Sequence, residues 1–125
     1  MNEVMSFRKM VKPEDLNPAN CLFGGEIMRW LDEAAAMYAI CQLKTKRMVT
    51  LKVSELLFKN PGYQGDVVEF FCKTVKVGKS SFTVGVTAKT KEIDKPSREI
   101  VTAELVFVTI NEFGKPRHHN FKGDL

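Results

Sequence analysis

The sequence has few cysteines and lacks any long apolar run. Its three cysteines, Cys21, Cys41 and Cys72, are odd in number and far apart, with no CxxC pair. This spacing argues against a disulfide framework and a zinc site, so we expect small buried thiols in a reducing cytoplasm. No segment approaches the roughly 18 apolar residues of a membrane span. Residues 1–15 mix charges without the apolar core of a secretory signal. We therefore expect a cytoplasmic protein without a membrane span.

The chain also lacks a strong bias of charge. With 125 residues, 44% hydrophobic and 27% charged, it has the size and composition of one globular domain, which we expect to occupy residues 1–125. The net charge of +4 bears on anionic partners and not on the fold. Its lysines are scattered through strand-like segments and do not interleave with aromatic residues. This pattern suits a phosphate-bearing small molecule and does not indicate nucleic-acid binding.

One segment has the periodicity of a helix. From Gly24 and Gly25 onward, apolar residues recur every three or four positions as far as Cys41. Polar residues at positions 42–47 end the pattern. Residues 34–40 are apolar nearly all round, which predicts a helix that is buried on most sides.

The other patterned segments are typical of strands. Residues 4–11 loosely alternate, and four longer alternating segments are bounded by turn residues: 48–58, 67–77, 80–90 and 99–110. No helix-sized segment separates these four, so we expect an antiparallel meander. One long buried helix and one long sheet pack together when the sheet curls around the helix. The sequence thus predicts an α+β hotdog fold, a central helix wrapped by a five- to six-stranded antiparallel sheet in the order strand, helix, four strands.

A single sheet of this kind has open edges. Long edge strands are normally covered or paired, so we expect a homodimer whose two sheets join edge to edge. The partly apolar outer face further suggests a tetramer or hexamer packed through the sheets.

Two glycines at the predicted helix start leave backbone N–H groups uncovered. The first N–H groups of a helix have no partner within it and lie at its positive end, where they can polarise a carbonyl oxygen or hold an oxyanion. Alternatively, Gly24 and Gly25 only relieve crowding where the loop enters the core.

Asp32 is the candidate for acid–base chemistry. It lies about two turns into the predicted helix, in line with Met28 and residues 35–36 on an otherwise apolar stripe. Aspartate is a poor helix former, and an unpaired buried carboxylate is costly, which favours a carboxylate that activates water or attacks a carbonyl. The structural alternative is an ion pair with Arg29 on a solvated edge.

Three further features allow either a chemical or a structural role. Asn17 could orient water or a carbonyl through its amide, or form an Asx turn before Pro18. His118 and His119 point to opposite sides of an extended tail and have no third ligand nearby, so we expect no metal site. A predicted turn, alternatively a plain hairpin, offers phosphate an ammonium group, two hydroxyls and backbone N–H groups: Gly78, Lys79, Ser80 and Ser81.

The stretch from Asn17 to Asp32 resembles the signature of the hotdog-fold acyl-CoA hydrolases, the group of bacterial YciA-type enzymes and the mammalian cytosolic long-chain acyl-CoA hydrolase. That pattern runs roughly D-x-N-x-x-G-x-x-F/H-G-G-x-x-M-x-x-x-D-E, and it is matched here by Asp15, Asn17, Phe23, Gly24, Gly25, Met28, Asp32 and Glu33. Similar motifs follow in order along most of the chain: Val49-Thr50, Phe58-x-x-Pro61, Gly65-Asp66-Val67, Val77-Gly78-Lys79-Ser80-Ser81, Phe107-Val108 and Gly114-Lys115-Pro116. Where the family usually has glycine this chain has Asn20, a residue type that tolerates a left-handed backbone.

The resemblance implies hydrolysis of acyl-CoA thioesters to coenzyme A and a carboxylic acid. It implies that Asp32 is the catalytic carboxylate, acting as general base or nucleophile, with Asn17 supplied by the other subunit at a dimer interface. Gly24 and Gly25 would then be the oxyanion donors, and the Gly78–Ser81 turn would contact the phosphates of coenzyme A. The family needs no metal or organic cofactor, since coenzyme A is part of the substrate.

Two other functions compete with this one. A non-catalytic acyl-CoA-binding hotdog module could act as a sensor, although no helix-turn-helix accompanies it. A hotdog dehydratase acting on acyl carrier protein would need a histidine near the helix, and both histidines lie in the tail.

Overall fold

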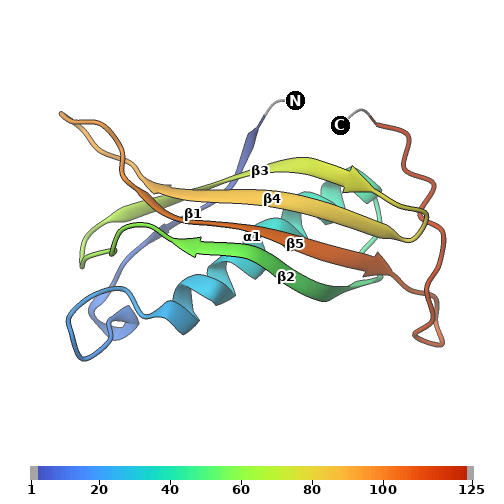
Figure 1. The fold of residues 1–125 in the computed structure, drawn as a ribbon, viewed down its shortest axis with the longest axis horizontal. Coiled ribbons are helices and arrows are strands. Elements are labelled where there is room, and N and C mark those ends of the chain that lie inside the picture. The colour runs from blue at the N-terminus through green and yellow to red at the C-terminus, as the bar shows by residue number, and fades with distance from the viewer. Residues whose placement is uncertain (1–2, 124–125) are drawn as a thin grey trace.

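A long helix lies across one face of a five-stranded antiparallel sheet (Figure 1). The computed structural model describes residues 3–123, so residues 1, 2, 124 and 125 of the predicted domain lie outside the described part. The elements in chain order are β1 (Val4–Met10), the 3-10 turn η1 (Pro13–Asp15), α1 (Gly24–Leu43), β2 (Met48–Phe58), β3 (Val67–Val77), β4 (Ser81–Thr90) and β5 (Glu99–Thr109). The predicted strands agree with these bounds to within one residue at each end. Over residues 3–123, no helix combines the length and apolar content that a bilayer crossing requires.

The order of the strands corrects the predicted meander. Neighbours are antiparallel throughout, in the order β1-β3-β4-β5-β2, so β3, β4 and β5 form a meander but β2 pairs with β5. A tight hairpin turn forces two strands to pair, whereas residues 59–66 form a longer link between β2 and β3. The backbone of this link is held elsewhere, since the N–H of Lys59 bonds to the oxygen of Ile100 and the oxygen of Gly62 accepts from Leu22. The link therefore crosses the end of the sheet.

The core lies between α1 and the inner face of the sheet. Alanines at positions 34, 35 and 39 are fully buried, so the helix approaches the strands closely, and larger side chains fill the space beside them: Ile27, Trp30, Leu31 and Tyr38 from α1 with Phe70, Phe82 and Phe107 from the sheet. Residues 34–40 are buried on most sides, as predicted, since Met37, at 39%, is the one exposed residue among them. Glu33, just before them, is also exposed. One side of α1 is therefore open in the single chain.

The edge strand β2 is strongly apolar. Its large side chains are between 37% and 66% exposed: Val49, Leu51, Val53, Leu56, Leu57 and Phe58. An exposed strand edge with apolar side chains is a surface that proteins cover or pair, which supports the predicted edge-to-edge dimer.

The cysteines only partly follow the sequence prediction. All three are free, as expected of a chain without a disulfide framework. Cys72 is buried, and burial raises the pKa of its thiol to about 11. Cys41, however, is exposed and Cys21 is half-buried, so the prediction of small buried thiols is wrong for Cys41, which lies on the open side of the helix.

Candidate active site

Asn17 shapes the loop that leads into α1. Its Oδ1 accepts hydrogen bonds from the N–H groups of Ala19 (2.9 Å) and Cys21 (3.1 Å), so the Asx turn considered from the sequence is present. Its Nδ2 donates to no acceptor among residues 3–123 and remains available to a ligand. In the same loop Asn20 has a φ of 63°, the left-handed conformation that glycine adopts most easily and asparagine tolerates. The loop thus keeps a glycine-like backbone.

The first N–H groups of α1 are uncovered. The residue before the helix, Phe23, has no side-chain acceptor and forms no side-chain cap. Glu26 and Ile27 donate to the Phe23 oxygen, whereas the N–H groups of Gly24 and Gly25 find no acceptor in the described part of the chain. A Cβ at Gly24 would meet nothing within 4 Å, but one at Gly25 would lie 2.9 Å from the Phe23 ring. Gly24 therefore borders open space, and Gly25 also makes room for an aromatic side chain.

A pocket of about 440 Å³ opens beside this helix start. Asn17 and Gly24 line it together with mainly apolar neighbours: Leu22, Ile27, Phe58, Pro61 and Ile100. Its size and apolar walls are those of a small-molecule site. The structure thus brings together Asn17 and the helix start, two of the predicted site features.

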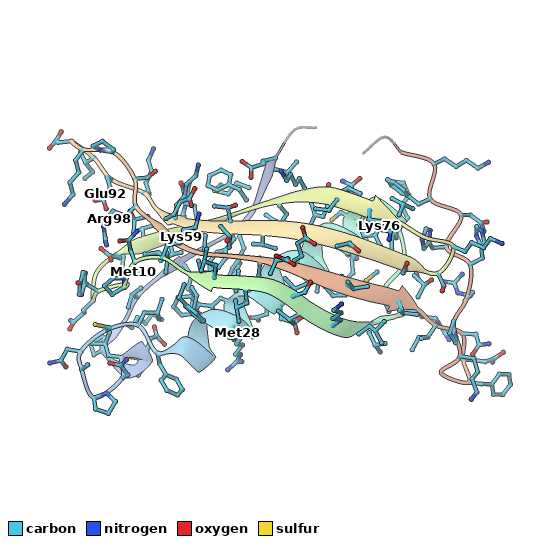
Figure 2. All side chains as sticks on the ribbon, viewed as in Figure 1. Met10, Met28, Lys59, Lys76, Glu92 and Arg98 are labelled. Carbon is cyan, nitrogen blue, oxygen red and sulfur yellow. The ribbon has the colours of Figure 1, made fainter. Side chains whose placement is uncertain are left out.

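Arg98 holds the outer wall of this pocket in place. Its guanidinium donates to the Pro61 oxygen (3.2 Å) and to Asp66 Oδ2 (2.8 Å), and its Nε also lies 3.6 Å from Glu92 Oε2. Figure 2 shows Arg98, Glu92 and the pocket residue Lys59 at the same end of the molecule, where the β4–β5 loop projects. The link between β2 and β3 is therefore anchored on both sides of the pocket.

Asp32 lies elsewhere on the helix and is exposed in the single chain. The prediction from its apolar stripe, that it would be buried, is therefore wrong for one chain. Thr50 Oγ1 donates to Asp32 Oδ1 at 2.8 Å, and no ion pair joins Asp32 to Arg29 over the described residues. The inner face of β2, on which Thr50 pairs with Phe107 of β5, faces this part of α1. Asp32 is thus a hydrogen-bonded carboxylate beside the apolar edge of the sheet.

Asp32 and the helix start of one chain cannot act on the same carbonyl group. Eight positions separate Gly24 from Asp32, which amounts to about 12 Å along a helix. A reacting carbonyl has to lie within about 3 Å of its oxyanion donors and of the attacking group. Within one chain, Asp32 and the helix start therefore do not meet at one reacting carbonyl.

The turn formed by residues 78–81 lies at the opposite end of the molecule. It is a tight hairpin, in which the Gly78 N–H donates to the Ser81 oxygen (3.0 Å), and a Cβ at Gly78 would lie 2.2 Å from Ser81 Oγ. Gly78 therefore has the structural role considered from the sequence, and Lys79 at the tip is exposed. The turn adjoins the C-terminal end of α1, about 30 Å from Gly24 for a helix of 20 residues. One chain does not bring this turn to the pocket.

The C-terminal tail is hydrogen-bonded to the rest of the chain. His119 is half-buried and contacts the turn formed by residues 78–81, while His118 is exposed. Over residues 3–123, no group of three or more histidine, cysteine, aspartate or glutamate side chains is arranged to hold a metal ion. Thr50 and His119 are the residues that sequence reasoning missed. Thr50 fell in a matched motif, Val49-Thr50, but nothing in the sequence joined it to Asp32.

Comparisons with known proteins give a consistent result. Residues 19–97 match the family described as the thioesterase superfamily. The chain is 34% identical over 107 residues to an uncharacterised acyl-CoA thioester hydrolase of Buchnera aphidicola subsp. Schizaphis graminum, with 82% of this chain and 78% of the relative covered. It is 29% identical over 114 residues to the acyl-CoA thioester hydrolase YciA of Salmonella typhimurium, with 88% and 85% covered.

Solved structures are similar over most of the chain. A hexameric hotdog fold thioesterase of Campylobacter jejuni superposes with a TM-score of 0.84 at 29% identity, over 94% of this chain and 90% of that one. An acyl-CoA hydrolase of Staphylococcus aureus, in complex with butyryl coenzyme A, coenzyme A and coenzyme A disulfide, gives a TM-score of 0.83 at 27% identity, over 90% and 68%. Structures of its alanine variants at one aspartate, one asparagine and one threonine are also similar. The predicted hotdog fold is confirmed.

Proposed function

Because the chain belongs to the thioesterase superfamily, we propose that it hydrolyses acyl-CoA thioesters at a site built by two chains. Asp32 of one chain is the catalytic carboxylate, and the helix start and Asn17 of the other chain bind the reacting carbonyl and water. The observation that carries this proposal is the position of Asp32. Thr50 holds it beside an exposed apolar edge, about 12 Å from the uncovered N–H groups of its own helix.

Two-fold pairing of the β2 edges would unite these parts. The end of β2 adjoins the helix start, since Phe58 lines the same pocket as Gly24. In an antiparallel pair of β2 strands centred near Val53, the end of each strand lies beside the start of the other. The pocket of one chain then adjoins Thr50 and Asp32 of its partner. In each chain the β3–β4 turn lies about one helix length from the pocket of that chain. The same pairing therefore brings the turn of the partner close to the pocket in which the substrate binds.

The proposed reaction needs three groups. The N–H groups of Gly24 and Gly25 bind the thioester oxygen and stabilise its negative charge as the carbonyl carbon becomes tetrahedral. Asp32 removes a proton from water, whose oxygen attacks that carbon, while the free Nδ2 of Asn17 orients the water or the carbonyl. The carbon–sulfur bond breaks, the thiolate of coenzyme A takes the proton from Asp32, and the carboxylic acid leaves. No metal or organic cofactor takes part.

Direct attack by Asp32 is the alternative route to the same products. The carboxylate would then form an anhydride with the acyl group, which water hydrolyses in a second step. A single turnover in water labelled with ¹⁸O separates the routes, because attack by water puts no label into Asp32 and anhydride hydrolysis at the carboxyl carbon of Asp32 does. Mass spectrometry of the peptide that contains Asp32 reads the result.

We also propose that the dimers assemble further, as in the hexameric relatives of known structure. The outer face of the sheet is the surface available for this contact, and light scattering of the full chain tests the mass. A cytoplasmic location is part of the proposal, because unpaired cysteines are the rule in that reducing compartment.

Release of coenzyme A tests the proposed function. Wild-type protein should release free thiol from acyl-CoA esters in a series from acetyl to palmitoyl. Asp32→Asn should lower kcat by about 10² to 10⁴, the usual contribution of a general base, with the assembly unchanged. Because Cys41 is exposed, a thiol reagent needs a blank without substrate. Tight binding of coenzyme A without turnover at any chain length would instead support the non-catalytic binding module.

A further inference from the structure

The C-terminal tail returns across the turn between β3 and β4. After β5, Asn111 Oδ1 accepts hydrogen bonds from the N–H groups of Phe113 (2.8 Å) and Lys115 (3.0 Å), which reverses the chain. The N–H of Arg117 then donates to the Thr109 oxygen at 2.8 Å. Figure 1 shows the tail running from the end of β5 past the β3–β4 turn toward the C-terminus. The tail therefore lies against the turn formed by residues 78–81.

His119 makes three hydrogen bonds at this place. Its backbone N–H donates to the Lys79 oxygen at 3.1 Å, and its ring Nε2 lies 2.9 Å from the Ser81 oxygen. Its Nδ1 accepts from the N–H of Phe121 at 3.1 Å. A carbonyl oxygen only accepts and an amide N–H only donates, so Nε2 carries the proton and Nδ1 does not. The bonds to the Lys79 and Ser81 oxygens hold the turn. The bond from Phe121 fixes the orientation of the imidazole ring.

Aromatic packing keeps the histidine ring in place. The ring of Phe121 meets the buried Phe82 edge to face, with centroids 5.2 Å apart, and the His119 ring lies 6.3 Å from Phe82. Phe82 is fully buried under the sheet, and it is the second residue of β4. The ring of His119 is thus attached to the core at the place where the strand leaves the turn.

These contacts draw the carbonyl groups of the turn to one side. The Ser80 oxygen accepts from the N–H of Thr109 (2.8 Å), while the oxygens of Lys79 and Ser81 accept from His119. The N–H groups of Lys79 and Ser80 have no acceptor over residues 3–123. Successive N–H groups left free in a turn form a concave site for an anion. The exposed Lys79 ammonium adds a positive charge beside them.

We propose that His119 positions the residue 78–81 turn to bind a phosphate group of coenzyme A. The proposal rests on the proposed function, because it assumes that acyl-CoA is the substrate. His119 does not touch the reacting atoms, so it is a positioning residue. Its effect should be confined to the phosphate-bearing part of the substrate, whereas a residue that only stabilises the fold would affect every thioester alike.

The test compares substrates with and without phosphate. His119→Phe keeps the ring against Phe82 but removes both ring nitrogens, and His119→Gln restores a donor near the Ser81 oxygen. We expect His119→Phe to raise the KM for butyryl-CoA about tenfold, because a displaced turn would lose about one hydrogen bond from its N–H groups to the charged phosphate. The kcat should stay within about twofold. The KM for S-butyryl-N-acetylcysteamine, which has no phosphate, should not change. His119→Gln should recover most of the loss, and His119→Ala replaces the phenylalanine variant if that protein does not fold.

The 3′-dephospho form of butyryl-CoA locates the phosphate. A KM effect of His119→Phe that disappears with this substrate assigns the turn to the 3′-phosphate, and one that persists assigns it to the diphosphate. An unchanged KM for butyryl-CoA, or equal rises for all three thioesters, would overturn the proposal. If wild-type protein hydrolyses none of them, the proposed function fails, and calorimetry with coenzyme A decides about His119. A dissociation constant about tenfold weaker in His119→Phe supports the positioning role, and an equal constant overturns it.

Discussion

Two inactive variants should restore activity when their chains are mixed. Asp32→Ala removes the proposed catalytic carboxylate from one chain. Asn17→Asp keeps the Oδ1 that accepts from the N–H groups of Ala19 and Cys21, so the loop is preserved, but it removes the free Nδ2 donor. If the site takes Asp32 from one chain and Asn17 from the other, a mixed dimer has one site with both residues and one site with neither.

The size of the recovery follows from the two-fold symmetry. Random association of equal amounts gives mixed dimers in half of the cases, and one of their two sites is intact, so about a quarter of wild-type activity should return. The alternative, a site within one chain, predicts no recovery, because every chain then has a defective site. The separation of about 12 Å between Asp32 and the helix start of its own chain is the structural reason to expect the first result.

The assay unfolds the two variants together in denaturant, refolds them and measures release of coenzyme A at saturating acyl-CoA. Each variant refolded alone gives the baseline. Wild-type chain mixed with the double variant Asn17→Asp/Asp32→Ala is the matched control. There the mixed dimers have no intact site, so activity should fall to about a quarter of that of wild-type chain alone at the same total concentration. Activity of the first mixture at the baseline, with heterodimers demonstrated by two different tags, would refute the shared site.

Three other predictions concern the partner of Asp32, the buried thiol of Cys72 and the β2 edge. Thr50→Val should lower kcat about 10- to 100-fold, because a hydrogen bond to the charged Asp32 contributes about 1.5–3 kcal/mol, and Thr50→Ser should restore it; equal rates would remove Thr50 from the mechanism. Burial raises the pKa of Cys72 from 9.0 to about 11, so the folded chain holds this proton more tightly than the unfolded one. The stabilisation that comes from this bound proton is complete below pH 9 and lost by about pH 11. Urea titrations should therefore show the free energy of unfolding falling by about 2–3 kcal/mol between these two pH values. The Cys72→Val variant should not show this fall. Leu51→Glu on the β2 edge should give inactive monomers by light scattering, whereas Ile93→Glu, on a side chain 93% exposed in the β4–β5 loop, should not; an active Leu51→Glu dimer would contradict edge pairing.

Sequence periodicity predicted the elements of the fold but not the place of β2. Alternation within residues 48–58 depends on one strand and its two faces, so the bounds of β2 were predicted to the residue. Which strand lies beside it depends on contacts between distant segments. The link at residues 59–66 is tied to Ile100 and Leu22, and neither contact leaves a local pattern in the sequence.

The candidate site shows the same limit. The period of α1 placed Asp32 correctly relative to its own helix, but its burial depends on what lies opposite, and in one chain that is only the Thr50 hydroxyl. Asn17 has both of the roles considered for it available, since Oδ1 forms the Asx turn and Nδ2 stays free. The role of His119 depends on the tail folding back, which polar residues after position 110 did not indicate.

The edge position of β2 is the structural reason for proposing a site divided between two chains. Had β2 paired with β3, as a meander requires, the β5 edge would be open, and Thr50 would not connect α1 to an exposed edge. With β2 outermost, the strand that exposes the apolar edge also supplies the hydrogen bond to Asp32. In the proposed dimer, a second chain that covers this edge would exclude water from the surroundings of the carboxylate and bring a helix start toward it. On this proposal, dimer formation and assembly of the catalytic groups depend on the same strand, so a substitution that separates the chains should remove activity even if every proposed catalytic residue is retained.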